Sequence, residues 1–267
     1  MNWNRSLSMA AGLAVTLAGS AAHADEAAAA VTSTNAVVPT PPPAKWSTSL
    51  NVGVTITSGN SDSLLGTIDF LTDRKTDKNE LKIGGAGGYG ETRNTSQGTT
   101  TVTINANFVG GFVQDNVSFT ERLYGYARVD ARHDEVADIA YRVPIGVGAG
   151  YYVVKTKPSE LSFELGPGYL WQKVGGVASD FATLRIAELF RRELTDRSRL
   201  RENVEWLPQI DKFSNYILNA SITLEADLTK DKNSNMSLTL LDTYNSEPAS
   251  GKERNDLKLI AAVGCKF

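Results

Sequence analysis

Cysteine and histidine are nearly absent from this sequence. One of its 267 residues is cysteine, Cys265, and two are histidine, His23 and His133. A single cysteine excludes an intrachain disulfide. The histidines are not part of an H-E-x-x-H motif, and no paired His or Ser/His spacing accompanies them. The sequence therefore predicts neither a metal site nor a cofactor.

A strong excess of charge of one sign is also missing. The chain has 27 Lys and Arg residues and 30 Asp and Glu residues, and the net charge is -3. A nucleic-acid-binding protein usually carries a basic patch or stripe. This balance argues against nucleic acid as a partner.

Long apolar runs are absent apart from one short stretch at the N-terminus. Arg5 precedes an apolar run at residues 6–19, and Ala22-His23-Ala24 fits an A-x-A cleavage site. The run is too short to span a bilayer as a helix. Residues 1–24 are therefore predicted to be a cleaved secretory signal peptide, which places the mature protein outside the cytoplasm.

The next segment, residues 25–45, is rich in alanine, threonine and proline. Four of its prolines lie close together at positions 39 and 41–43. Clustered prolines favour an extended, semi-rigid chain without a core. We interpret this segment as a disordered periplasmic tether, which leaves residues 46–267 as one folded domain.

From Trp46 onward, apolar and polar residues alternate. In "WSTSLNVGVTIT", for example, every second side chain from Leu50 to Ile56 is apolar. Twelve such segments follow one another between polar turns, most of them about 9–12 residues long, as tilted membrane strands of ~9–11 residues are. Strands of soluble proteins are more often about 5–6 residues long. The pattern predicts an all-β fold, an antiparallel up-and-down transmembrane β-barrel of about twelve strands; the alternative is a periplasmic β-sandwich.

Large aromatic residues fall near the ends of the predicted strands. In the fourth segment the alternation assigns Val102, Phe108 and Phe112 to the same, outward face. A turn is expected after it, at Gln114–Asn116. With this assignment the aromatics form two sets, as amphipathic rings do at the two interfaces of a bilayer. The periplasmic set is Trp46, Phe70, Phe112, Tyr151, Phe190 and Phe267, and the opposite set is Tyr89, Trp171, Trp206 and Tyr216.

The chain ends in "LKLIAAVGCKF", an alternating strand that finishes on an aromatic residue. Val263, Cys265 and Phe267 share one face of this strand. A last strand of this kind is typical of the assembly signal of outer-membrane proteins. We therefore expect Val263, Cys265 and Phe267 to be recognised by the barrel-assembly machinery, and the barrel to lie in an outer membrane of Gram-negative type.

The middle of the chain resembles a known family. Residues 127–171 include Gly146-x-Gly148-x-Gly150-Tyr151 and Glu164-x-Gly-Pro-Gly-Tyr169, and Ser58-Gly59-Asn60 ends an early strand. This ordered set is similar to the DUF481 family of YdiY-like, salt-induced outer-membrane proteins. One departure is the third outer loop, which reads "HDEVAD" where the family frequently has an aromatic residue. The resemblance implies an outer-membrane location and little about activity.

The lumen-facing residues follow from the same alternation, because outward apolar positions fix the inward ones. The inward set predicted to form an ion-pair network is Tyr126, Arg128, Asp130, Arg132, Glu164 and Arg185. One interpretation is a brace that fills the interior, and the other is a constricted pore. Eight strands leave room for side chains only and sixteen leave a channel, so twelve strands are compatible with both.

Two carboxylates do not fit the alternation. Glu188 and Glu202 occupy positions that the pattern assigns to lipid. A carboxylate there is costly. Either a β-bulge turns one of them inward, or this face of the eighth and ninth strands is a protein contact, such as a homo-oligomer interface.

The predicted function is that of a non-enzymatic outer-membrane protein, with a structural or envelope-stress role or with a narrow pore for ions and small solutes. The alternative is an outer-membrane enzyme that hydrolyses lipid or peptide at the extracellular rim. His133, beside Asp134 and Glu135, is the only histidine after signal removal. It lacks partners at catalytic spacing, so we predict no catalytic residue.

Overall fold

The computed structural model describes residues 46–57, 62–96 and 99–267, so the predicted signal peptide and tether lie outside the described residues. The chain forms twelve β-strands: β1 (Trp46–Thr57), β2 (Asp62–Lys75), β3 (Asn79–Ser96), β4 (Thr99–Ser118), β5 (Leu123–Asp134), β6 (Ile139–Lys155), β7 (Ser159–Val174), β8 (Val177–Thr195), β9 (Ser198–Gln209), β10 (Lys212–Asp227), β11 (Ser234–Asn245) and β12 (Asn255–Lys266).

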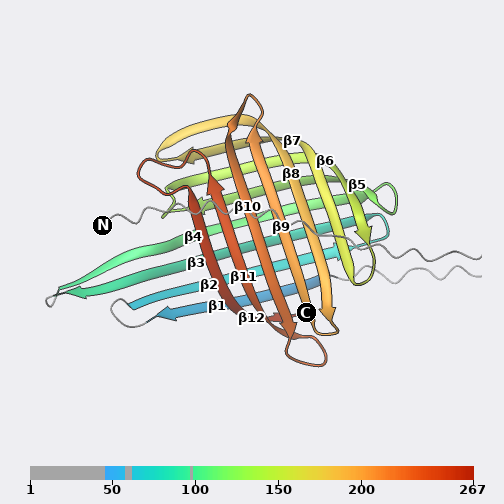
Figure 1. Ribbon diagram of the computed structural model, residues 1–267, viewed down its shortest axis with the longest axis horizontal. Coiled ribbons are helices and arrows are strands. Elements are labelled where there is room, and N and C mark those ends of the chain that lie inside the picture. Colours follow the sequence, from blue (N-terminus) through green and yellow to red (C-terminus); the bar gives the residue numbers. More distant parts are fainter. Residues whose placement is uncertain (1–45, 58–61, 97–98) are drawn as a thin grey trace, which may run out of the picture. The chain divides into compact units, whose positions relative to one another are not determined.

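Each strand pairs antiparallel with the next one along the chain, and β1 pairs with β12 to close a barrel (Figure 1). The prediction of a twelve-stranded up-and-down barrel is therefore confirmed. No helix among the described residues is long and apolar enough to cross a membrane.

Most connections between strands are short, and the longest, between β11 and β12, covers residues 246–254. β7 and β8 are joined by Gly175 and Gly176, whose φ angles of 59° and 77° lie in the left-handed region. A two-residue hairpin turn with positive φ at both positions favours glycine, which has no Cβ to clash. Short turns of this kind let the backbone hydrogen bonds between neighbouring strands continue close to the rim of the barrel.

The outer wall of the barrel is apolar. Every strand except β9 exposes large hydrophobic side chains there, among them Val52, Ile68, Val113, Val129, Val147, Leu165, Leu224, Leu240 and Leu259. A soluble monomer rarely exposes an apolar surface of this extent. The wall instead suits contact with lipid hydrocarbon.

Aromatic side chains gather at the end of the barrel where β9 ends and β10 begins. Trp206 lies 6.1 Å from Phe213 and 6.3 Å from Tyr216, and Tyr216 stacks on Tyr244 at 5.5 Å between ring centroids. At the opposite end Phe70, Tyr151 and Phe267 are exposed. The two aromatic sets thus lie as the sequence predicts, with one exception.

The exception is Phe112, which was predicted to point outward and points into the lumen. Between β3 and β4, Gly90 lies opposite Ala106 and Glu91 lies opposite Ile104, so Asn105 is an extra residue. A bulge of one residue moves every later side chain of the strand to the other face.

Phe108 and Phe112 consequently lie over two glycines of β3. A Cβ placed on Gly88 would come within 2.6 Å of the Phe108 ring, and one on Gly84 within 2.5 Å of the Phe112 ring. The glycine-rich run at residues 84–90 therefore makes room for inward aromatic rings.

The turn predicted at Gln114–Asn116 is also wrong, because β4 continues to Ser118. Gln114 and Asn116 are buried inside the barrel. In a soluble sheet three consecutive polar residues favour a turn, but the interior of a membrane barrel is itself polar. Polar residues alone therefore do not mark the end of a strand in this fold.

The last residues of the chain close the barrel. β1 and β12 pair from Ser49 opposite Lys266 to Gly53 opposite Ala262. Beyond them, the backbone N–H of Phe267 donates to the carbonyl oxygen of Thr48 at 2.8 Å, and the N–H of Thr48 donates back at 3.2 Å. Val263, Cys265 and Phe267 share the outward face, while the outer halves of β1 and β12 are not paired with each other among the described residues.

Candidate functional site in the lumen

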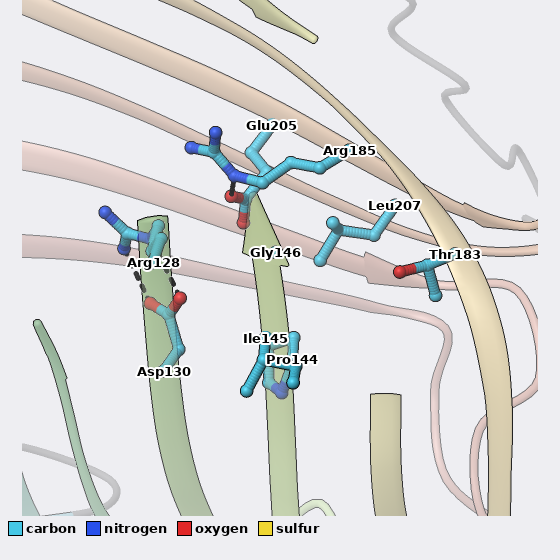
Figure 2. Close-up of a pocket in the computed structure, with 9 residues that line it drawn as sticks. All are labelled: Arg128, Asp130, Pro144, Ile145, Gly146, Thr183, Arg185, Glu205 and Leu207. Carbon is cyan, nitrogen blue, oxygen red and sulfur yellow. Dashed lines mark hydrogen bonds and ion pairs between the residues drawn. The ribbon is translucent and has the colours of Figure 1, made fainter. Parts of the chain in front are cut away.

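At the centre of the barrel interior, the buried side chain of Arg185 is paired with two carboxylates. The Nη1 atom of Arg185, on β8, lies 2.6 Å from Oε2 of Glu164 on β7, and its Nε atom lies 2.6 Å from Oε1 of Glu205 on β9. Glu205 also accepts a hydrogen bond from Asn219. Figure 2 shows Arg185 and Glu205 joined in this way, near the Arg128–Asp130 pair.

Glu164 carries the network across to β4 and β5. Its Oε1 atom accepts from the hydroxyl of Tyr124 at 2.8 Å and from Nε2 of Gln114 at 3.0 Å. Gln114 in turn accepts from Arg128 at 2.9 Å. Arg128 makes a two-pronged contact with Asp130, with bonds of 2.8 and 2.6 Å. Glu164 is only 1% exposed, so these partners replace the water that a buried carboxylate would lose.

Aromatic rings support the two arginines. The guanidinium of Arg185 lies 4.9 Å from the ring of Tyr126, and that of Arg128 lies 4.2 Å from the ring of Phe112. Tyr126 and Tyr124 fit against Gly148 and Gly150 of β6, where a Cβ would overlap their rings. We call this group the lumen brace; its members are Gln114, Tyr124, Tyr126, Arg128, Asp130, Glu164, Arg185, Glu205 and Asn219.

Five of the six residues predicted for the lumen belong to the brace: Tyr126, Arg128, Asp130, Glu164 and Arg185. Arg132 does not. It pairs with Asp134 at 2.7 Å in a separate group, where Lys258 of β12 comes within 3.9 Å of the same carboxylate.

Sequence reasoning missed two members of the brace. Gln114 was read as part of a turn, and Glu205 was not singled out. The alternation places Asn219 in the lumen but does not indicate its bond to Glu205. Glu205 could have been found, because Leu200 and Val204 point outward on β9 and fix its odd-numbered positions inward.

A second ionic cluster lies near the other end of β10. The alternation predicts that its carboxylates, Glu225 and Asp227, face the lumen, but it does not indicate their basic partners. Arg199 reaches both Glu225 and Asp227 at 2.6 Å, and Lys266 lies 2.6 Å from Glu225. Arg201 pairs with Glu225 as well. This cluster ties β9, β10 and β12 together beside the closing seam.

An open cavity of about 590 Å³ occupies much of the remaining lumen. Ten strands contribute to its wall, and β7 and β8, which carry Glu164 and Arg185, do not. The cavity is therefore displaced toward the opposite side of the barrel from the centre of the brace. Along β11 its lining residues run from Asn235 to Thr243, a distance of about 27 Å at ~3.4 Å per residue.

The wall of this cavity carries charges of both signs. Its basic residues are Arg128, Arg132, Arg142, Arg201 and Lys258, and its acidic residues are Asp69, Asp130, Glu205, Glu225, Asp242 and Asp256. A smaller cavity of about 10 Å³ lies between Arg128, Arg185 and Leu207 (Figure 2). That is about enough space for one water molecule.

The remaining chemistry on the described residues is sparse. His133 is exposed, and its Nδ1 atom lies 3.0 Å from the carbonyl oxygen of Ala140. No group of three or more His, Cys, Asp or Glu side chains that could hold a metal ion occurs in the described part of the chain.

Glu188 and Glu202 both lie on the outward face. The register of β8 and β9 is continuous from Ile186 opposite Trp206 to Glu193 opposite Arg199, so the β-bulge that could have turned one of them inward is not there. A homo-oligomer contact through this face stays a prediction.

The model of the family described as "Protein of unknown function, DUF481" matches residues 50–267. The chain belongs to the DUF481 family. The resemblance seen in the sequence is therefore confirmed, and the match covers every strand of the barrel. No curated protein matches this DUF481 chain.

Several solved barrels are similar in structure to this DUF481 protein. The NanC porin is 10% identical, with a TM-score of 0.48 over 82% of this chain and 98% of the porin. The KdgM porin is 7% identical, with a TM-score of 0.44 over 83% and 98%. The COG4313 outer membrane channel from Pseudomonas putida F1 is 11% identical, with a TM-score of 0.46 over 89% and 100%. At these values the likeness does not extend to a shared activity.

Proposed function

We propose that this protein is a non-enzymatic outer-membrane β-barrel that passes ions and small solutes through a narrow, off-centre lumen. The observation that carries the proposal is the cavity of about 590 Å³ beside the lumen brace. A barrel with a purely structural interior would have its lumen filled by side chains, as eight-stranded barrels do.

The outer membrane is proposed as the location because several independent features favour it. The wall exposes large apolar side chains on eleven of the twelve strands, all but β9, which suits lipid as the partner of that surface. The N-terminus carries a predicted signal peptide, and Phe267 completes the seam between the first and last strands. These features fit export followed by insertion with the help of the barrel-assembly machinery.

The dimensions of the cavity limit what could pass. A volume of about 590 Å³ spread over ~27 Å of strand gives an average cross-section on the order of 20 Å². This suits water, inorganic ions and small solutes in a nearly extended form. Because the wall has charges of both signs along its length, selectivity would depend on where unpaired charges lie.

An enzymatic role at the extracellular rim has less support. His133 lies in the region that such a site would use, but the bond that its ring makes is to the carbonyl oxygen of Ala140. Among the described residues, no hydroxyl or thiol that could act as a nucleophile is hydrogen-bonded to this ring.

The pore is tested by two neighbouring substitutions on β11. Ser237 lines the cavity, and Leu238 lies on the outer wall and is exposed. Ser237→Trp places a bulky ring in the cavity, so the single-channel conductance of the refolded barrel in a planar bilayer should fall by at least half. Leu238→Trp adds the same ring on the lipid face and should leave the conductance unchanged.

Two results would contradict the pore. The first is an unmodified barrel that inserts but does not conduct. The second is an equal conductance for Ser237→Trp and Leu238→Trp, which would mean that current does not follow this cavity.

A further inference from the structure

Two arginines face each other across β5 and β6 inside the barrel. Arg132 and Arg142 are direct partners in the antiparallel register, and both line the cavity. Like charges at directly opposite positions of a sheet repel each other and destabilise the pair. The pair therefore destabilises the sheet unless a negative charge lies between or beside the two guanidinium groups and offsets the repulsion.

The carboxylates around this pair do not balance it. Arg132 is paired with Asp134, and Lys258 approaches the same carboxylate. Arg142 is 6% exposed and makes no ion pair with any residue that the structure describes. Asp256, two residues from Lys258 on the same face of β12, is the other carboxylate nearby. Three cations and two carboxylates leave an excess of one positive charge at this corner of the lumen, and neither carboxylate is paired with Arg142.

Hydrogen-bond donors are also left over. Within the described residues, Nη2 of Arg142 and Nε of Arg132 are enclosed atoms without a hydrogen-bond partner. A buried donor of a charged group that is left unpaired loses its bonds to water and gains none in return, which destabilises the fold. The other side of the Arg142 guanidinium is fixed, because its Nε atom donates to Gln172 at 2.9 Å. The group is thus held in place with unused donors.

We infer that the Arg132–Arg142 pair, together with Lys258, binds a small oxyanion in the lumen. A phosphate, sulfate or carboxylate group accepts several N–H bonds at once and matches the planar fork of arginine. The anion neutralises the excess charge, and a guanidinium that turns toward the cavity brings its unpaired donor to the anion. The side chain of Arg132 is 29% exposed, so it can turn toward a ligand in the cavity.

Lys258 gives this site a second wall. It extends from β12 across the lumen to the Asp134 carboxylate of β5, and its ammonium lies 4.4 Å from the ring of Phe108 on β4. The bound anion would therefore lie where the lumen is crossed by a side chain. This inference rests on the proposed function only in that the anion enters through the lumen, and it makes small oxyanions the solutes that the pore favours.

Binding is measured on the intact refolded barrel in nonionic detergent, by calorimetric titration with inorganic phosphate. We expect saturable binding by the unmodified protein. Arg142→Gln should weaken phosphate binding at least tenfold, because it removes the unpaired cation. Arg93→Gln removes the same charge from an exposed pair with Glu91 at the far end of β3, and it should leave binding unchanged. Acetate as a second probe shows whether carboxylates are accepted as well as phosphate.

A substitution of opposite sign separates binding from a structural effect. Asp134→Asn removes the one carboxylate that competes for Arg132, so phosphate should bind more tightly even if the barrel becomes less stable. Equal phosphate binding by the unmodified protein and Arg142→Gln would overturn the anion site, as would weaker binding by Asp134→Asn.

The titration and the bilayer recording can fail separately. Saturable binding that depends on Arg142, in a barrel that does not conduct, supports the anion site and contradicts the pore. A barrel that conducts but shows no phosphate binding in the titration supports the pore and contradicts the anion site.

Discussion

Single residues inside the barrel show how a polar lumen can be both filled and satisfied. Glu164 is enclosed, yet its two oxygens receive bonds from three side chains on three other strands, Gln114, Tyr124 and Arg185. Leaving one partner of a buried pair uncompensated is strongly destabilising, whereas a complete pair is close to neutral. The brace is therefore a means of fixing the positions of strands as much as a source of stability.

Glu164→Gln keeps the shape of this side chain and removes its charge. Arg185 retains Glu205, so we expect the free energy of unfolding to fall by about 2–3 kcal/mol, less than for a fully broken buried pair. The measurement is guanidinium-induced unfolding of the refolded barrel. Glu193→Gln, which breaks the solvent-exposed pair with Arg191, is the control and should cost under about 1 kcal/mol. Equal losses in the two variants would mean that Glu164 is not part of a brace.

The inward direction of Glu164 and Arg185 was predictable from their apolar neighbours, because a strand has only two faces. Their partners were harder to predict. Gln114 belongs to β4, which reaches β7 only across the lumen, and no local pattern encodes contacts through the interior. The arrangement of Arg132 opposite Arg142 depends in the same way on the register between β5 and β6, which alternation alone does not determine.

At the scale of the strand, the hydrophobic period predicted the number and order of strands, while local irregularities changed which way residues point. The bulge at Asn105 reversed the face of Phe108 and Phe112, and nothing in the composition of β4 marks it. The glycines of β3 are the signal that could have indicated the change, since their missing Cβ atoms leave space for two rings. A strand pattern is therefore best read together with its neighbour.

The seam between β1 and β12 gives Phe267 a structural role. Deleting Phe267 removes the backbone bonds to Thr48 together with the ring, whose burial in lipid is worth only about 1.5–3 kcal/mol. We expect assembly to slow and a protease-sensitive form to accumulate, while barrels that do form stay folded. Protease protection followed over time in cells or in vesicles measures this effect.

Phe267→Ala serves as the companion variant, because it keeps the backbone bonds and loses the ring. A defect shared by the deletion and by Phe267→Ala would assign the effect to the aromatic ring. A normal rate and yield after deletion would contradict a role for Phe267 in assembly.

For the whole molecule, the sequence predicted a closed barrel but left open whether its lumen was filled. The answer depends on the summed volumes of side chains from twelve strands. The brace concentrates large side chains near β7 and β8, while β1, β3 and β11 contribute smaller groups such as Ser49, Gly87 and Ser237 to the cavity wall. This uneven distribution, rather than the strand number, is what leaves space for a pathway.

The central claim is that this cavity forms a continuous aqueous path through the membrane. Thr239 lies midway along β11 and lines the cavity, and Leu238 beside it faces outward. Each is replaced by cysteine in a Cys265→Ser background, and the protein is reconstituted in vesicles with a charged, membrane-impermeant thiol reagent on one side at a time. We predict that Thr239→Cys is modified from either side and Leu238→Cys from neither. Modification of Thr239→Cys from only one side, or from neither side, would contradict a continuous path.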